Sequence, residues 1–257
     1  MFQARLLRPY TERLFRASGL APGMRVLDLG SGVGDVALLA ADIVGPGGHV
    51  VGIDRDAKGL ERARQRTVEQ GCSSRVSFQT ATLDDFSTDE QFDAVVGRFI
   101  LFYQPDAPAT IRQFMRFLKP GGIVAFHEMD FANANGSYPP CALWDQACWL
   151  LAEVFRRGGA PPDFGRGVAK AFVDAGLPFP TVTAEAVMGG RRGSFLHPWV
   201  ANTLLILAPR MPGLGLTPPD GIVLDHTLAA TLEEAVVANG CQLIGPMQYG
   251  AWTTKPH

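Results

Sequence analysis

The sequence has no excess of basic residues. Its 257 residues include 23 lysines and arginines against 25 aspartates and glutamates, which gives a formal net charge of -2. A surface that binds the phosphate backbone of nucleic acid needs a concentration of positive charge. We therefore expect no nucleic-acid partner.

Long apolar runs and paired cysteines are also missing. No uninterrupted apolar stretch reaches the length of about 18 residues expected of a transmembrane helix, so no membrane partner is expected. The four cysteines show no CxxC spacing, and reduced, buried thiols are the expected state. An arginine-rich N-terminus also fits a transit peptide, but an amphipathic helix that leads directly into the first strand explains it equally well. We expect a cytoplasmic protein.

What the chain does have is a glycine turn in an informative setting. An apolar, β-prone run from Val26 enters three glycines at alternate positions, Gly30, Gly32 and Gly34, and an apolar helix pattern continues from Asp35. A turn that brings backbone N–H groups against a ligand has no room for a Cβ and can require positive φ. A ligand that carries adenosine or an anionic group can then lie over the helix N-terminus.

The spacing of the glycines separates this turn from the dinucleotide-binding fingerprint. That fingerprint is G-x-G-x-x-G, whereas this chain has G-x-G-x-G preceded by Asp28. A second apolar strand, 49–54, ends in Asp54 about 20 residues after the turn, where a carboxylate can accept both hydroxyls of a ribose. This pair indicates an adenosine-type cofactor and disfavours a nicotinamide oxidoreductase. The alternative role for Asp54 is to cap the helix that begins near Ala57.

Five features, taken in order, carry a family resemblance. They are Asp28, the glycines, Asp54, the strand 92–97 and the sequence Leu118-Lys119-Pro120-Gly121-Gly122 before another strand. In that order they resemble the class I S-adenosylmethionine-dependent methyltransferase family, strongly over residues 14–128 and loosely from residue 181 onward. The resemblance implies an α/β fold with a doubly wound, seven-stranded, mostly parallel, Rossmann-like sheet and a helical lid formed by insertions. It also implies S-adenosyl-L-methionine as the cofactor.

The resemblance further implies which residues hold that cofactor. They are Tyr10, Asp28, Gly30, Ser31, Gly32, Gly34, Asp54, Arg55, Thr82, Leu83 and Arg98. Thr82 stands where the family commonly has an acid for the adenine amino group, so this contact is expected to be weak or to pass to Asp84. Arg98 follows the fourth strand, where its two donors can bind a carboxylate of the cofactor or substrate, or pair with a nearby acid. Tyr10 either reaches the cofactor from the N-terminal helix or packs in the core.

Two candidate catalytic residues, His127 and Glu128, stand at the end of the fifth strand. Histidine is the usual general base near neutral pH, whereas a glutamate needs a raised pKa or a cationic neighbour. Side chains alternate along a strand, so at most one of the two can face the pocket. The other interpretation for each is a hydrogen bond that holds the lid. Asp130 and Asn133 suggest a divalent metal, but further ligands are not evident and no metal is expected.

The rest of the chain departs from the minimal fold. We divide it into an N-terminal helix (1–20), a cofactor-binding core (21–130), a lid insertion (131–160), a core helix and strand (161–188), a second lid insertion (189–240) and a final edge strand (241–257). The two insertions are expected to meet over the carboxyl edge of the sheet. Their aromatic residues favour an apolar or aromatic small substrate, and the basic loop 189–193 is a candidate contact for an acidic substrate group.

Together these patterns predict methyl transfer to an O, N or C atom of a small, apolar or aromatic secondary metabolite, by a monomer or homodimer. The competing hypothesis is a cofactor-binding relative that does not transfer methyl, such as an isomerase, a cyclase or a binding module. The glycine turn and Asp54 predict cofactor binding in both cases. Release of S-adenosylhomocysteine is therefore the observation that separates them.

Overall fold

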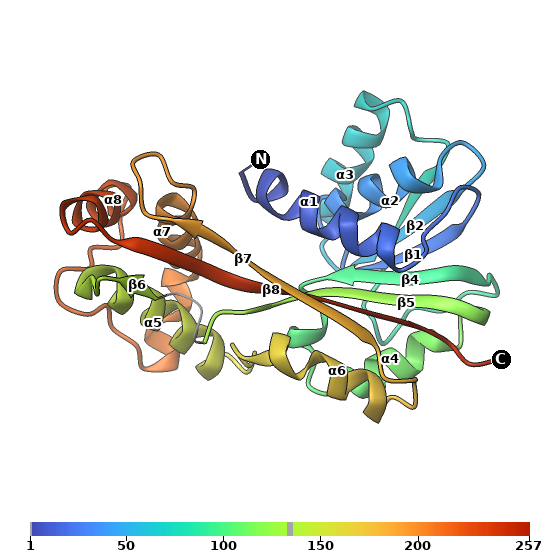
Figure 1. The fold of residues 1–257 in the computed structure, drawn as a ribbon. Helices are drawn as coiled ribbons and strands as arrows, with labels where there is room; N and C mark the ends of the chain where they lie inside the picture. The colour runs from blue at the N-terminus through green and yellow to red at the C-terminus, as the bar shows by residue number, and fades with distance from the viewer. Residues whose placement is uncertain (1, 133–135) are drawn as a thin grey trace.

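The computed structural model describes residues 2–132 and 136–257, arranged as two lobes joined by two long strands (Figure 1). The larger lobe is a sheet with helices on both faces. The smaller lobe, which we call the cap, contains β6 (Ser137–Tyr138), α5 (Ala142–Arg157), α7 (Leu196–Leu207) and α8 (Leu228–Ala238). The strands shared by the lobes are β7 (Thr181–Gly189) and β8 (Gln242–Thr254).

Strands and helices alternate in the first half of the chain. The order is α1 (Phe2–Ala17), β1 (Arg25–Leu29), α2 (Asp35–Val44), β2 (His49–Asp54), α3 (Ala57–Glu69), β3 (Val76–Thr80), β4 (Phe92–Arg98), η1 (Leu101–Tyr103), α4 (Ala107–Met115) and β5 (Leu118–Asp130). In the second half, α6 (Phe164–Asp174) precedes β7, and the short turns η2 (Ala208–Arg210) and η3 (Pro212–Leu214) follow α7. This alternation is the pattern of a parallel sheet with crossover helices.

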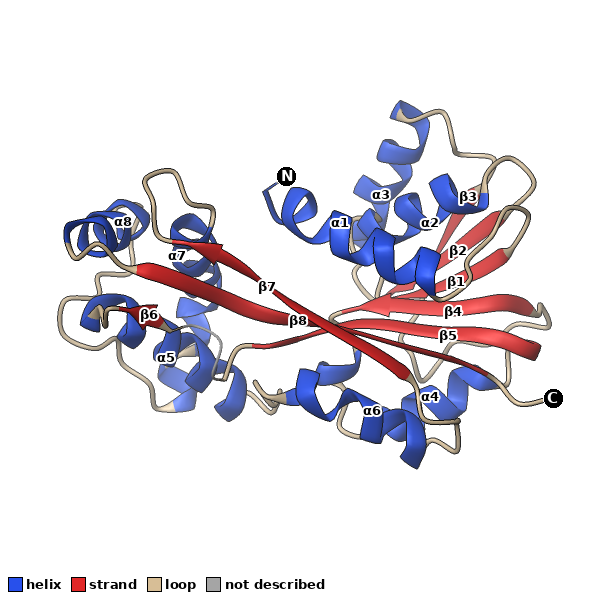
Figure 2. Cartoon of the chain, viewed as in Figure 1, coloured by secondary structure: helices blue, strands red, loops and turns tan. Residues whose placement is uncertain are grey.

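The sheet has the order β3-β2-β1-β4-β5-β8-β6, with β7 also paired to β8 (Figure 2). All pairs from β3 through β5 are parallel, and β8 runs antiparallel to its neighbours. The mostly parallel, doubly wound sheet is thereby confirmed, with the two-residue β6 added to the expected seven strands. The order reverses between β1 and β4, and their carboxyl ends therefore form a ligand-binding switch point.

The prediction that the last strand lies at the edge of the sheet is wrong. Leu243 in β8 pairs with Ser137 of β6 and with Gly189 of β7, and β5 pairs with β8 further along. The last strand therefore has neighbours on both sides, and β7 forms the edge. The apolar pattern of 246–254 predicted a strand there but carried no information about its neighbours.

Alternate residues of the same strands fill two separate cores. Leu27 and Val95 face a cluster that includes α4 and α6 residues, whereas Val26 and Val96 face the cluster of α1 and α2. Side chains of a strand point alternately to opposite faces, and strands covered on both faces are apolar throughout. The two cores hold the carboxyl ends of the parallel strands in fixed positions.

The cap has a third core of its own. Trp144 of α5, Leu204 of α7 and Leu232 of α8 are fully buried there, together with Leu243 of β8 and, near the sheet, Phe102. The two predicted insertions therefore pack against one another. They also reach the segment that follows β4.

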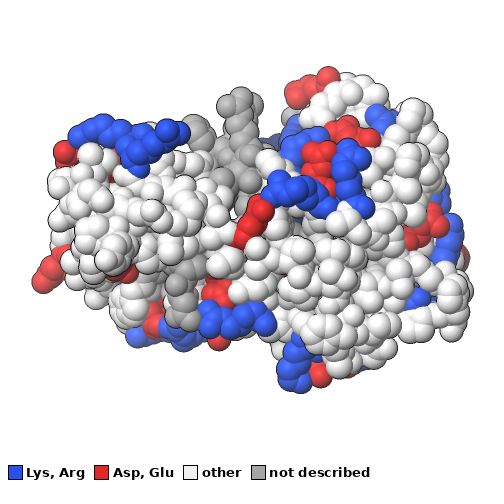
Figure 3. All heavy atoms as spheres, viewed as in Figure 1, with Lys and Arg blue, Asp and Glu red and all other residues white. Residues whose placement is uncertain are grey.

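The surface carries no large patch of one charge on the face shown in Figure 3, where acidic and basic side chains are interspersed among uncharged ones. Within the described part of the chain, no helix is long and apolar enough to cross a membrane.

Candidate functional site

The glycine turn lies at the carboxyl end of β1. Gly30, Gly32 and Gly34 have φ values of 69°, 51° and 83°, a region that residues with a Cβ seldom adopt. A Cβ on Gly30 would also lie 2.6 Å from Cδ1 of Ile100. Gly30 is therefore required by its conformation and by its neighbour, and the segment after β4 lies directly against the turn.

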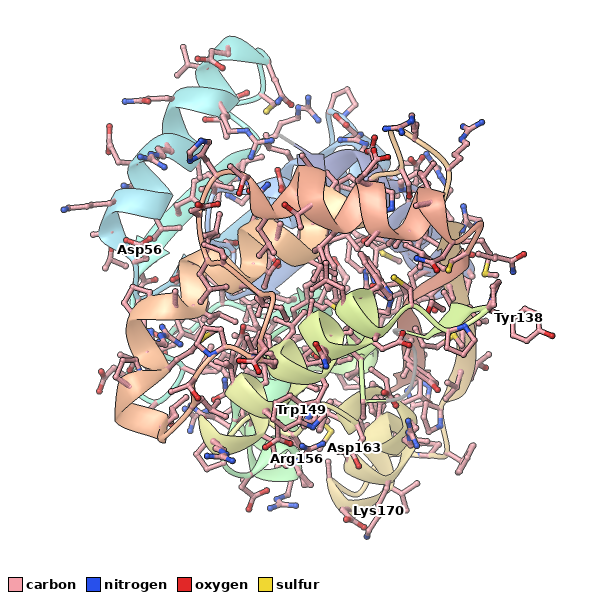
Figure 4. The ribbon with its side chains drawn as sticks, turned by 90° about the vertical axis from the view of Figure 1, so that its left-hand side faces the viewer. Asp56, Tyr138, Trp149, Arg156, Asp163 and Lys170 are labelled. Atoms are coloured by element: carbon pink, nitrogen blue, oxygen red, sulfur yellow. The ribbon has the colours of Figure 1, made fainter. Side chains whose placement is uncertain are left out.

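Asp54 holds the turn from the end of β2. Its Oδ2 accepts a hydrogen bond from the N–H of Gly32 at 2.8 Å, and its Oδ1 accepts one from the N–H of Asp56 at 2.8 Å. Each carboxylate oxygen can accept a second bond, so Asp54 keeps capacity for two hydroxyl donors. Capping of α3 falls to Asp56, which lies at one end of this helix in Figure 4. Its Oδ1 accepts from the N–H of Lys58. The alternative capping role for Asp54 is thus wrong, and Arg55 is exposed beside it.

Asp28 is a buried carboxyl group beneath the turn. It is 0% exposed, its Oδ2 accepts a hydrogen bond from Oγ of Ser31, and its Oδ1 has no partner among residues 2–132 and 136–257. Burial raises the pKa of Asp28 to about 7, while the Ser31 hydrogen bond and the charge of Arg98 oppose the rise. Perturbed, half-satisfied buried groups of this kind often mark functional sites.

Arg98 ends β4 close to Asp28. Its side chain is 11% exposed, and its contacts are long, at 3.4 Å to Oγ1 of Thr11 and 3.5 Å to Oδ2 of Asp35. Asp35 makes a shorter ion pair, 2.7 Å, with Arg66. Within the described part of the chain, no carboxylate engages both donors of Arg98. Weak pairing with an acid and binding of an anionic ligand group both fit this geometry.

The loop that follows β3 lies near the glycine turn, but its side chains mainly contact residues of the same loop and of the core. The N–H of Ala81 donates to the carbonyl of Asp54 at 3.0 Å, which places the corner beside the expected ribose acid. The Thr82 hydroxyl donates to Oδ2 of Asp85 at 2.6 Å. Leu83 packs against the core between the sheet and α4. The structure therefore gives the Thr82 hydroxyl a partner within its own loop.

His127 is enclosed and both of its ring nitrogens have polar partners. Nδ1 lies 2.9 Å from Oγ1 of Thr11, and Nε2 lies 2.9 Å from Oε1 of Gln248. The amide NH₂ of Gln248 donates to the carbonyl of Pro246, which leaves the amide oxygen to accept a hydrogen bond from the N–H of Nε2. A neutral imidazole has one N–H. The Thr11 hydroxyl oxygen receives Arg98, and its single proton lies within reach of two acceptors, Nδ1 of His127 and the carbonyl oxygen of Leu7, each at 2.9 Å.

This environment corrects the interpretation of His127 as a general base. Burial first, and the Arg98 charge second, lower the pKa of His127 to about 3. The side chain is 0% exposed, and a base must reach the proton that it removes. His127 instead connects β5 with α1 and β8. Its hydrogen bonds are structural, but they do not hold the lid, because Thr11 and Gln248 lie outside both insertions.

Glu128 points to the opposite face, as its position next to His127 predicted. Its Oε1 accepts from the N–H groups of Ile100 at 3.2 Å and Leu101 at 2.9 Å, so it satisfies the free donors at the start of η1. Burial raises the pKa of Glu128 to about 8, against the hydrogen bonds from the η1 backbone. The side chain is 0% exposed, and its geometry is that of a positioning residue for the segment after β4.

Tyr10 is not brought to the glycine turn. Its hydroxyl lies 2.8 Å from the carbonyl oxygen of Thr183 in β7 and 3.0 Å from Oγ1 of the same residue. The ring packs edge-on against His127, with 4.8 Å between centroids. The core role expected as the alternative is therefore the one that the structure supports.

Asp130 has protein partners rather than a cluster of further acids. Its Oδ2 accepts from Nε of Arg166 and its Oδ1 from the N–H of Ala132. Asn133, its suggested partner in a metal site, lies outside the described residues. In the two described ranges, no group of three or more His, Cys, Asp or Glu side chains could hold a metal ion.

Two features at the end of β4 were missed by sequence reasoning. Phe99 has a φ of 56°, which is rare for a bulky residue and is typical of strained functional positions. Beyond it, Tyr103 lines a pocket of about 360 Å³ together with cap residues that include Phe155 and Arg210. The β-prone pattern of 92–98 carried no signal for either, because the pocket joins residues more than 50 positions apart.

The cap aromatics have unequal roles. Trp144 is fully buried in the cap core, whereas Tyr138 is 81% exposed and projects away from the body of the molecule (Figure 4). Trp149 is 51% exposed on α5. Of the aromatic residues expected in this insertion, Phe155 is the one that lines the pocket beside Tyr103.

Comparison with known proteins agrees with this geometry. The chain is 39% identical over 125 residues to a 2-phytyl-1,4-naphtoquinone methyltransferase of Synechococcus elongatus, covering 48% of this chain and 54% of the relative. The chain thus spans about half the length of this curated relative.

Solved structures share the fold over nearly the whole chain. A cyclopropane-fatty-acyl-phospholipid synthase-like protein from Lactobacillus casei matches with a TM-score of 0.62 and 19% identity, covering 98% of this chain and 91% of that protein. The [4+2]-cyclase SpnF matches with a TM-score of 0.57 and 22% identity, covering 96% and 80%.

A family model, described as a methyltransferase domain, matches residues 20–155. The matched range is more than half of the chain and contains the glycine turn, Asp54 and Arg98. It supports S-adenosylmethionine as the cofactor. The chain belongs to the methyltransferase domain family.

Proposed function

We propose that the protein binds S-adenosylmethionine at the glycine turn and transfers its methyl group to an O, N or C atom of a small apolar or aromatic acceptor. The observation that carries the proposal is the contact between Asp54 and Gly32. It holds a carboxylate with spare acceptor capacity against a glycine turn, beside the switch point of an open α/β sheet.

The residues at this position fit such a cofactor. Asp54 can accept the ribose hydroxyls, and the glycines allow close approach of the backbone. Asp28 in β1 and Arg98 at the end of the neighbouring β4 bring a buried carboxyl group and a guanidinium to the same part of the sheet edge, near enough for the Arg98 charge to oppose the rise in the pKa of Asp28. This pair suits a ligand group that carries both an ammonium and a carboxylate, which is the amino-acid end of S-adenosylmethionine.

The bound cofactor would supply an electrophilic methyl group. The chain's contribution is to hold donor and acceptor in line, which can supply roughly 7–11 kcal/mol of the barrier. Since His127 and Glu128 are both enclosed, neither is assigned as a base. We therefore propose an acceptor that needs no side-chain base, either because it is already anionic or because it has a free electron pair.

The second candidate, cofactor binding without methyl transfer, has one observation in its favour. The [4+2]-cyclase SpnF has the same fold, so the fold alone does not decide between the two. The remaining expectations, a role in secondary metabolism, a cytoplasmic location and a monomeric or homodimeric state, complete the proposal.

The test is calorimetric titration with S-adenosylmethionine, followed by incubation of the loaded protein with small phenols, enols, amines and acids. Acceptor-dependent release of S-adenosylhomocysteine supports methyl transfer. Tight binding without product over the whole panel would favour the non-methylating candidate, and failure to bind would overturn both.

A matched pair of variants tests the site itself. Asp54→Asn should weaken cofactor binding by about 1–3 kcal/mol, because one carboxylate acceptor is lost at a hydrogen-bonded position. The exposed Asp89 provides the control Asp89→Asn, for which affinity should stay unchanged. Equal affinities in the two variants would remove Asp54 from the site.

A further inference from the structure

The pocket between the cap and the segment after β4 is partly open to solvent and has mainly apolar walls. Phe155 of α5, Leu207 of α7 and Leu214 of η3 line it, facing Tyr103 of η1. Its volume of about 360 Å³ lies within the range of small-molecule sites. An aromatic or alicyclic ring system is the type of ligand that such walls bury well.

Few polar residues line the pocket, and the one charged side chain among the described lining residues is positive. Arg210 of η2 lines the pocket and is exposed, and it forms no ion pair with any carboxylate within the two described ranges. Tyr103 lies near enough to interact electrostatically with this guanidinium. Burial raises the pKa of Tyr103, and the Arg210 charge opposes the rise. The pocket therefore offers an unpaired cation and a phenolic hydroxyl to a ligand.

In the basic loop 189–193 of the cap, one of the two arginines is already paired with acids. Arg192 in the loop 189–193 lies 2.8 Å from Oε2 of Glu234 and 3.8 Å from Oε1 of Glu233. Glu233 also accepts from the N–H of Gly193. This loop, the expected contact for an acidic substrate group, is thus a weaker candidate than Arg210.

The pocket is joined to the glycine turn through one short helical turn. Ile100 lies against Gly30, and the N–H of Tyr103 donates to the carbonyl of Ile100 at 3.3 Å. Residues three apart in a 3₁₀ turn lie one above the other, about 6 Å along the axis. Glu128 fixes the start of this turn, so the pocket adjoins the proposed methyl-donor site.

The far wall is braced as well. Nη1 of Arg157 on α5 donates to the carbonyl oxygens of Leu214 at 3.1 Å and Gly215 at 2.9 Å. These bonds fix η3 to α5, and with it the wall opposite Tyr103. A wall fixed in this way loses little conformational entropy when a ligand binds.

We propose that this pocket is the acceptor site, and that Arg210, with Tyr103, selects ring-sized apolar acceptors that carry an anionic oxygen. The inference rests on the proposed function and adds the chemical class of its substrate. Arg210 is here a specificity-determining residue, because its proposed contact is with the acidic group of the acceptor. It need not contact the atom that receives the methyl group.

Two probes of the same shape test the charge preference. 2-Naphthoate and naphthalene-2-carboxamide are titrated into the full chain, with binding followed by ligand-observed NMR and calorimetry. A charge-assisted hydrogen bond predicts about 10- to 100-fold tighter binding of the naphthoate. Arg210→Gln should abolish that preference, whereas Arg191→Gln, an exposed arginine of the basic loop, should retain it.

A steric variant provides an independent test. A side chain on Gly213, which lines the pocket, meets nothing within 4 Å, so Gly213→Phe should fold and obstruct the pocket. Gly167 on α6 has the same open surroundings, and Gly167→Phe is the matched control. Naphthoate binding should fall at least tenfold in the first variant and stay unchanged in the second.

The outcomes separate this inference from the proposed function. Equal binding of both probes, a preference that survives Arg210→Gln, or no binding of either probe would overturn the acceptor-site inference. If S-adenosylmethionine still binds in that case, the proposed function stands. If S-adenosylmethionine itself fails to bind, the proposed function fails, whatever the probes do.

Discussion

Nδ1 of His127 lies 2.9 Å from Oγ1 of Thr11, so two fully buried side chains join the end of β5 to helix α1. The contact makes His127 part of the packing of α1. It also explains why a histidine at the end of β5 need not be a catalytic base.

His127→Leu should lower the free energy of unfolding by about 1–3 kcal/mol, because Thr11 and Gln248 each lose a buried partner. Urea denaturation measures this change, with His226→Leu at an exposed position as the control. Turnover per folded molecule should persist. Unchanged stability with abolished turnover would restore the role of general base.

Tyr10→Phe distinguishes the two roles considered for Tyr10. The hydroxyl bonds to Thr183, so its removal should cost about 0.5–1.5 kcal/mol of stability and leave the affinity for S-adenosylmethionine unchanged. Tyr138→Phe, at an exposed side chain, should change neither quantity. Weaker cofactor binding at full stability would show that Tyr10 does reach the cofactor.

Glu128 should make stability depend on pH in a defined direction. Burial raises its pKa from the ordinary value of 4.5 to about 8 in the folded protein, so the folded state binds more protons than the unfolded state between these values. Stability from this group is therefore fully present below pH 4.5 and decreases as pH rises through about 8.

Glu128→Gln removes that titration while keeping an oxygen to accept the η1 N–H groups. Between about pH 5 and pH 8, the melting temperature of the variant should decline less than that of the natural protein. This range of about three pH units lies between the unfolded-state and folded-state pKa values of Glu128. His127→Leu serves as a comparison, since loss of a lowered pKa acts mainly at acid pH. Identical slopes for Glu128→Gln and the natural protein would contradict the assignment.

Gly30→Ala should damage both stability and cofactor binding. The new Cβ would require a φ of 69° and would clash with Ile100, at a cost of about 1–3 kcal/mol. Gly213→Ala has open space around its Cβ and should unfold at the same urea concentration as the natural protein. Full cofactor affinity in Gly30→Ala would remove this glycine from the proposed site.

The helices and strands were predictable because their signals are local. Apolar periodicity and glycine punctuation placed the start of α2 at Asp35 and placed β2 over His49–Asp54, as the structure has them. The position of β8 was not predictable, because neighbours in a sheet depend on contacts distant in sequence. The same limit applied to the extra strand β6.

The same distinction between local and distant contacts decides which parts of the candidate site were predictable. The glycine turn and Asp54 lie within one β-α-β unit, and their spacing predicted that both belong to one ligand site. The hydrogen bond that joins Gly32 to Asp54 was not predicted. The partners of His127 come from α1 and β8, 116 and 121 positions away. Tyr103 and Arg210 likewise meet only when the cap folds, so their combination had no signature in the sequence.

Strand β8 places Leu243 in the core of the cap and Ala251 in the core of the sheet. β7 pairs with it on both sides of an irregularity between Ala186 and Met188, so the two lobes share a two-stranded ribbon and not a loop. A rigid-body rotation of the cap relative to the sheet would break backbone hydrogen bonds between these two strands. Ligand exchange should therefore proceed by bending or twisting of this ribbon and by movement of the turns around the pocket, with the lobes unfolding as one mechanical unit.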